Sequence, residues 1–152
     1  MHASRRTLLE ALPLIATSFV LGGDSSSAVA CGAVEEAKPI ASFATPFDQL
    51  PVHTNATNTA RPILDGISHS GAHLEVHETS LSAGAMPHPP HHHVHEELFL
   101  ISKGTLEVTI AGKSTTIGPG SAAYVHSGEE HGVRNIGQDT AQYFVVAVGS
   151  ES

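Results

Sequence analysis

The sequence has few aromatic residues, a single cysteine and few basic residues. Aromatic side chains make up 5% of the 152 residues and tryptophan is missing, whereas glycine occurs 14 times and proline 9 times. This composition disfavours a helical bundle and favours a turn-rich β protein of one domain. The lone cysteine excludes an intrachain disulfide, so packing must stabilise the fold.

Positive charge is also scarce. The 7 basic residues are outnumbered by 15 acidic ones, which gives a formal net charge of −8 at pH 7. This balance disfavours nucleic acid and anionic membrane surfaces as partners. The sequence also lacks an apolar stretch long enough to span a membrane. Histidine, in contrast, occurs 12 times.

The N-terminus has the layout of a secretory signal peptide. A basic start and a short apolar stretch precede the small residues Ala28–Ala30, which predicts a signal peptide over residues 1–30. Arg5 and Arg6 resemble the start of the bacterial twin-arginine signal, although Glu10 stands where that motif commonly has lysine. The alternative is a general export signal that happens to carry two arginines. Either signal predicts a bacterial protein exported to the periplasm or the medium.

The predicted cleavage site leaves Cys31 at or near the start of the mature chain. We expect a soluble mature protein, and the alternative is a lipid anchor on Cys31, although the sequence AVAC lacks the usual leucine of a lipoprotein signal. Residues 31–60 have no sustained period and predict a flexible lead and an extended arm. Residues 61–149 are the predicted domain, and residues 150–152 a C-terminal tail.

The predicted domain consists of short strands and turns. His73–Leu81 alternates apolar and polar residues, and so does the stretch TLEVTI, which ends in a turn at Ala111–Gly112 and predicts a hairpin with one buried face. Ala141–Gly149 is expected to be a closing strand. No stretch after the signal peptide has helical periodicity. The pattern therefore predicts an all-β domain, either a sandwich or a barrel.

Two of these strands are apolar on both faces. They are Glu97–Ile101 and Tyr143–Val148. A strand buried on both sides needs a second layer over its outer face. The arm or a second subunit could supply that layer, and we expect a homodimer.

The tract MPHPPHHHVHEELFLISKG contains a candidate metal site. His91, His93 and Glu97 are separated by even intervals, so a regular strand would aim all three at one side. Two imidazoles and a carboxylate are a known donor set for divalent transition metals. His88, His92 and His95 are expected at the rim or surface. His95 has the same parity as the ligands, so its direction depends on whether the strand bulges.

A second element offers one more imidazole. His131 follows a turn at Ser127–Gly128 and precedes a short strand. An imidazole delivered from another strand would complete a set of four ligands.

These two elements resemble the two motifs of the cupin superfamily. The first motif, G-x5-H-x-H-x3,4-E-x6-G, is met by the metal-site residues above and Gly104, with Gly84 one residue too far upstream. The second, G-x5-P-x-G-x2-H-x3-N, is met by Gly120, Gly128, His131 and Asn135. His126 stands where the family usually has proline.

The resemblance implies a single jelly-roll-type β-barrel that holds one divalent transition metal. The implied ligands are His91, His93, Glu97 and His131. Mn, Fe, Ni, Cu and Zn all remain open, because the ligands alone do not name the metal. Folding in the cytoplasm before twin-arginine export would favour Mn or Fe.

The expected function is that of an exported, metal-dependent enzyme that acts on a small molecule. Dioxygenase chemistry and Lewis-acid chemistry of an isomerase or lyase are both compatible with such a site. Glu97 would act as ligand and proton acceptor, and His126 would assist as a base or orient the substrate. The alternative for His126 is a tolerated residue at a wet turn. The alternative for the protein is a non-catalytic protein that binds metal or a small ligand.

Overall fold

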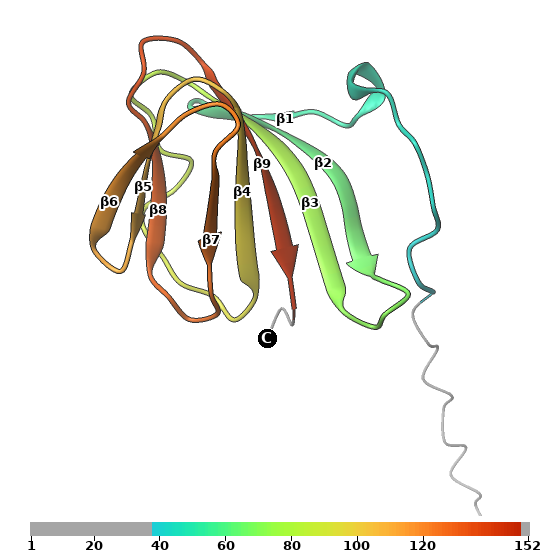
Figure 1. Ribbon diagram of the computed structural model, residues 1–152. Helices are drawn as coiled ribbons and strands as arrows, with labels where there is room; N and C mark the ends of the chain where they lie inside the picture. Colours follow the sequence, from blue (N-terminus) through green and yellow to red (C-terminus); the bar gives the residue numbers. More distant parts are fainter. Residues whose placement is uncertain (1–37, 150–152) are drawn as a thin grey trace, which may run out of the picture. The chain divides into compact units, whose positions relative to one another are not determined.

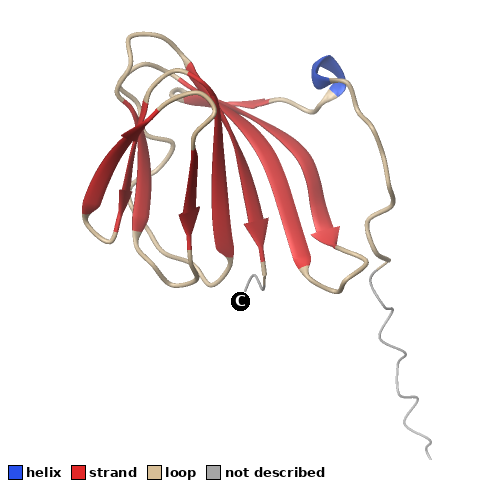
Figure 2. Cartoon of the chain, in the orientation of Figure 1, coloured by secondary structure: helices blue, strands red, loops and turns tan. Residues whose placement is uncertain are grey.

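The computed structural model describes residues 38–149, which form an all-β fold (Figures 1 and 2). The elements are η1 (Phe47–Gln49), a 3-10 turn, followed by β1 (His53–Thr54), β2 (Asn58–Ile67), β3 (His73–Leu81), β4 (Glu96–Lys103), β5 (Leu106–Ile110), β6 (Lys113–Ile117), β7 (Ala122–Val125), β8 (His131–Asn135) and β9 (Ala141–Val148). The predicted all-β class is confirmed. The predicted signal peptide and the C-terminal tail lie outside the described residues.

The strands form two antiparallel sheets. The larger sheet has the order β1-β2-β3-β9-β4-β7, and the smaller has the order β6-β5-β8. Within the described residues, no backbone ladder joins β6 to β7, so the expected barrel is an open pair of sheets and not a closed one. A groove lined by side chains of both sheets, among them Val108, Ile117 and Ala123, lies there instead.

The hairpin of β5 and β6 turns where the sequence predicts it. Ala111 and Gly112 both have positive φ, at 47° and 74°. A two-residue connection with positive φ at both positions matches the twist of the strands that it joins. The same hairpin buries Leu106 and Val108 on its inner face.

The core lies between the two sheets. It is built from apolar side chains of β3, β4, β5, β7, β8 and β9, namely Leu81, Phe99, Ile101, Leu106, Val108, Val125, Val133, Ala141, Tyr143 and Val145. Side chains of successive strand residues point to opposite faces, so β9 contributes Tyr143, Val145 and Ala147 to this interior.

Two polar side chains of β3 face the interior of the fold, and its valine side chain at position 76 faces outward. His77 and Thr79 line an internal cavity, so the polar side of the strand faces inward. Val76 pairs with Val146, which places both valines on the outer face of the large sheet. Polar residues can face inward here because they line a cavity and not a dry core.

The outer face of the large sheet carries exposed apolar residues. Leu100 is 41% exposed, Val148 39% and Tyr124 55%. The described part of the predicted arm contains β1, and it contacts β2 elsewhere: the Ile40 N–H donates to the Ile67 carbonyl oxygen at 2.8 Å. The expectation that the arm or a second subunit covers the outer apolar face stays a prediction.

Residues 38–149 contain no helix with the length and apolar character needed to cross a membrane.

Substitution of Gly104 tests why the first motif has glycine at this position. Its φ is +84°, and a Cβ added there would lie 2.7 Å from the Cα of Ala141. We expect Gly104→Ala to lower the free energy of unfolding by about 2–4 kcal/mol, since left-handed strain and a backbone clash add together. Urea unfolding followed by circular dichroism measures this change.

Gly120→Ala is the matched control. Gly120 has nearly the same φ, +82°, but a Cβ there would meet nothing within 4 Å. It should therefore lose only the strain energy of about 1–2 kcal/mol. Equal losses in the two variants would contradict the clash.

Candidate metal centre

The histidine tract is extended but is only partly a strand. The β4 strand begins at Glu96, and of the preceding residues only His91 forms a β-bridge, which pairs it with His131. The condition of a regular strand from His91 onward is therefore not met, and the irregularity left open at His95 is present. The alternation of burial nevertheless persists. His91, His93 and Glu97 are partly buried, whereas His92 is exposed.

Backbone hydrogen bonds bring the two motifs together. The His91 N–H donates to the His131 carbonyl oxygen at 3.0 Å, and the His131 N–H donates to the His91 carbonyl oxygen at 2.9 Å. The N–H of Gly128, whose φ is 79°, donates to the His93 carbonyl oxygen at 2.8 Å. The turn before β8 thus holds the tract against the first residue of β8.

His91, His93 and His131 form a group that could hold a metal ion. One ring nitrogen of each lies within 4.8 Å of the others. His131 is 2% exposed, and the other two are partly buried. The three predicted imidazoles are therefore brought together, although they come from separate segments of the chain.

Two of these imidazoles are oriented by backbone carbonyl groups. Nδ1 of His93 donates to the carbonyl oxygen of His95 at 2.9 Å, and Nδ1 of His131 donates to that of Glu129 at 3.0 Å. A neutral imidazole that donates through Nδ1 presents the lone pair of Nε2. Metal-binding histidines are commonly oriented in this way.

Unpaired nitrogen atoms support the fit to a metal. Nε2 of His93 and Nδ1 of His91 are buried and have no hydrogen-bond partner. A buried polar atom without a partner is costly, and a bound cation would remove that cost. The donor set therefore fits a divalent transition metal.

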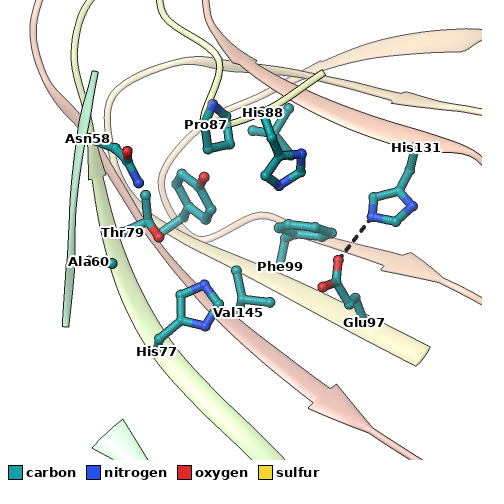
Figure 3. A pocket seen from close by; sticks show the side chains of 12 residues that line it. Asn58, Ala60, His77, Thr79, Pro87, His88, Glu97, Phe99, His131 and Val145 are labelled. Atoms are coloured by element: carbon teal, nitrogen blue, oxygen red, sulfur yellow. Dashed lines mark hydrogen bonds and ion pairs between the residues drawn. The ribbon is translucent and has the colours of Figure 1, made fainter. Parts of the chain in front are cut away.

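Glu97 lies beside this group. Its Oε2 is 3.0 Å from Nε2 of His131, and its Oε1 is 3.3 Å from Nε2 of His93 and 3.4 Å from Nε2 of His95. Figure 3 shows the pair that Glu97 makes with His131. The carboxylate is grouped with His93 and His95, whereas His91 belongs to the imidazole group alone.

The electrostatics of the group follow from burial and contact. Burial by itself would raise the pKa of Glu97, but the hydrogen bond from His131 and the charge of His93 lower it to about 2. The hydrogen bond to Glu97 raises the pKa of His131. Burial, followed by repulsion from neighbouring imidazoles, lowers the pKa of His91, so this ring favours the neutral form that a metal ligand requires.

A cavity of about 220 Å³ opens next to Glu97 and His131. Its remaining lining residues are Asn58, Ala60, His77, Thr79, Pro87, His88, Phe99, Val133, Tyr143 and Val145. In Figure 3, Glu97 and His131 stand on one side of the pocket, and Asn58 and Thr79 on the other. Oδ1 of Asn58 is buried and has no partner. The cavity is therefore apolar with a few polar groups, as small-molecule sites commonly are.

The sequence analysis did not identify the residues of β3 and β9 that line the cavity opposite Glu97. Thr79, His77 and Tyr143 lie on β3 and β9, outside both motifs. The polar side of His73–Leu81 was the available signal, because a polar row on an otherwise buried strand marks a cavity.

The structure does not bring His126 into this cavity. The side chain of His126 is 63% exposed, and its Nε2 pairs with Oε2 of Glu129 at 3.2 Å. It is not among the residues that line the cavity. This placement fits a tolerated residue at a wet turn. A catalytic role for His126 stays a prediction without a contact to support it.

The remaining histidines of the tract differ in placement. His88 is exposed but lines the cavity, with its ring 4.2 Å from that of His91. His92 is exposed. His95 is partly buried and contacts Glu97, so it belongs with the site and not with the surface.

The asparagine of the second motif has a structural role. Asn135 is fully buried, and its Nδ2 donates to the carbonyl oxygens of Leu81 and Asp139, at 2.9 and 2.8 Å. Its Oδ1 accepts a hydrogen bond from the Gly137 N–H at 2.9 Å. It therefore joins the end of β3 to the loop after β8 and takes no part in the donor set.

Two antiparallel β-sheets with three converging imidazoles define a small all-β protein whose histidines could hold a metal ion. The sequence pattern of the cupin domain matches residues 77–147. The chain belongs to the cupin superfamily. The search of curated proteins gave no match.

Solved structures share this fold at low sequence identity. An RmlC-like cupin from Shewanella frigidimarina has a TM-score of 0.62 and 14% identity, over 74% of this chain and 95% of its own. The polyketide cyclase RemF from Streptomyces resistomycificus has a TM-score of 0.60 and 20% identity, over 72% and 81%.

A third similar structure is the cupin domain of an XRE-family transcriptional regulator from Enterobacter cloacae. Its TM-score is 0.52 with 17% identity, over 63% of this chain and 99% of its own. At these identities the likeness concerns the fold, which serves both enzymes and non-enzymes.

The lowered pKa of Glu97 predicts a pH dependence of the metal-free protein. A carboxyl group whose pKa falls from 4.5 to about 2 on folding stabilises the fold above pH 4.5 and loses that contribution as pH falls toward 2. At pH 6–7, Glu97→Gln should therefore lower the free energy of unfolding by about 1–3 kcal/mol. Urea titrations of both proteins between pH 7 and pH 3 measure the difference, which should shrink on acidification. A difference that stays constant down to pH 3 would contradict the assigned contacts.

Proposed function

We propose that this cupin is a metal-dependent enzyme that acts on a small molecule, with the metal held by His91, His93, His131 and Glu97. The observation that carries the proposal is the convergence of three imidazoles next to a cavity, with two buried ring nitrogens that make no hydrogen bond. Purely structural histidines would have their nitrogens hydrogen-bonded within the fold.

When bound, a divalent metal would supply either dioxygen chemistry or Lewis-acid polarisation of the substrate. The chain's own residues have separate tasks. Glu97, whose pKa is lowered to about 2, stays ionised and can accept a proton at Oε1 or Oε2 once a substrate raises that value. The carbonyl groups of His95 and Glu129 keep the Nε2 atoms of their imidazole partners aimed at the site, and Nε2 of His131 would give up its proton when a metal binds.

The opposite wall of the cavity would orient the substrate. Burial raises the pKa of Tyr143, so its hydroxyl stays neutral beside Thr79. The Oδ1 of Asn58 offers an unpaired acceptor. No lysine or arginine is among the lining residues, so the cavity suits a small, uncharged molecule with hydroxyl or carbonyl groups, or an anion whose charge the metal neutralises.

A non-catalytic binding protein is the second candidate function. The exposure of His126 favours it, because that placement leaves Glu97 as the only predicted proton-transfer group at the cavity. The cupin domain of the Enterobacter cloacae regulator is an example of this fold in a non-enzymatic setting.

Metal removal and replacement test the proposal. The wild-type protein should bind one divalent metal per chain, and a chelator should abolish turnover of small phenols, hydroxy acids or sugar acids in a substrate panel. His93→Gln and His131→Gln should each weaken metal affinity by about 10- to 100-fold. Elemental analysis of protein from its native compartment and oxygen uptake or product formation are the measurements.

His92→Ala and His126→Ala are the matched controls, because both residues are exposed histidines near the site. They should keep the metal content of the wild type. A metal content that is equally insensitive to all four substitutions would refute the site. Full metal loading with tight ligand binding and no product would favour the binding protein.

We also propose that the protein is exported with residues 1–30 removed. The basic start, apolar stretch and Ala28–Ala30 support this proposal, and these residues lie outside the described part of the chain. Mass spectrometry of the secreted or periplasmic protein should find a mature N-terminus at Cys31. Arg5→Lys combined with Arg6→Lys should block twin-arginine export, and normal export of that variant would indicate the general route.

A further inference from the structure

His95 contacts the metal centre although the cupin motif does not include it. Its Nε2 lies 3.4 Å from Oε1 of Glu97. Its ring stacks on that of His93, with centroids 3.6 Å apart and an interplanar angle of 12°. A residue expected at the rim is therefore in contact with two of the proposed ligands.

These three residues form a donor set of their own. His93, His95 and Glu97 each place one ligand atom within 4.8 Å of the others. Two imidazoles and a carboxylate are sufficient to hold a divalent transition metal. This set shares His93 with the imidazole group described above, so the two groups overlap.

The two groups differ in their access to solvent. The side chain of His131 is 1% exposed, whereas those of His93 and His95 are 15% and 23% exposed. His93 belongs to both groups, so the difference lies in His131, which lines the cavity, and His95, which does not; Glu97 brings the second group to the cavity edge. The set with His95 therefore reaches the cavity through Glu97 and is nearer to solvent at His95.

The local backbone supports this second position. The carbonyl oxygen of His95 accepts the Nδ1–H of His93, and the buried Nε2 of His93, which belongs to both groups, makes no hydrogen bond and lies 3.3 Å from Oε1 of Glu97. Partial exposure of His95 allows its ring to turn toward an ion without repacking a core.

We propose that His93, His95 and Glu97 form a second, overlapping position for a divalent metal, nearer to solvent than the position made with His91 and His131. Only one ion is bound at a time, since the two positions share ligands. The inner position is preferred while all of its imidazoles are present, and the outer position takes the ion when the inner one is weakened. The inference rests on the proposed metal centre.

A double-mutant cycle with Co(II) tests this inference. The affinity and visible absorption of bound Co(II) are measured in the wild-type protein and in the His91→Ala variant, each with and without His95→Ala. In the wild type, His95→Ala should change the affinity by less than about 3-fold, because the inner position is intact. In the His91→Ala background, it should weaken the affinity by a further 10-fold or more and change the absorption spectrum, on the scale of lost ligand interactions.

His92→Ala in the same two backgrounds is the matched control, because His92 is exposed and belongs to neither group. It should have no effect in either. His91→Gln replaces His91→Ala if circular dichroism shows that the alanine variant is unfolded.

The outcomes separate this inference from the proposed function. A wild-type protein that binds no Co(II) would refute the proposed metal centre. Wild-type binding with equal effects of His95→Ala and His92→Ala in the His91→Ala background would overturn the outer position alone. A loss of 10-fold or more from His95→Ala in the wild type would also overturn it, because His95 would then be an ordinary ligand of a single position.

Discussion

The site depends on one pair of backbone hydrogen bonds. The reciprocal bonds between His91 and His131 hold the irregular histidine tract against the first residue of β8. This pairing is an isolated bridge, because the β4 strand begins only at Glu96. This bridge sets the distance between the two segments and so lets the imidazoles of two separate motifs converge. The Gly128 turn adds a third bond to the same tract, from its N–H to the His93 carbonyl oxygen.

Convergence of these side chains has an energetic consequence for the fold. Three imidazoles and the Glu97 carboxylate are enclosed next to a core of aliphatic and aromatic residues. Glu97 relieves part of this cost through its contacts with His131 and His93, while Nδ1 of His91 and Nε2 of His93 make no hydrogen bond. Buried polar atoms of this kind favour a bound cation, because coordination would remove the free-energy cost of burying them without a hydrogen bond. The same reasoning explains the inward polar side of β3, where His77 and Thr79 face a cavity and not a packed layer.

Much of this arrangement could be predicted from the sequence, and the reasons for the failures are local. Short-range periodicity predicted β3 with its observed bounds, and the Ala111–Gly112 turn followed from turn chemistry. The even spacing of His91, His93 and Glu97 also predicted that they share a side, although the metal itself stays a prediction. The failure concerns long-range geometry, because the gap between β6 and β7 depends on pairing between distant segments. For His126 the sequence left two interpretations open, and its exposure beside Glu129 fits a tolerated residue at a wet turn.

The position of His95 illustrates why parity along a strand is an incomplete guide. His95 shares the parity of the ligands, and parity alone cannot say whether it replaces one of them or lies behind them. The structure has bends instead of a strand at residues 94–95, and there the ring of His95 stacks on His93 and reaches Glu97. A tract with more imidazoles than one metal requires can therefore have two uses for them. Three of them converge beside the cavity, and His95, which is more exposed than His131, is the one that we propose as a ligand of the outer position.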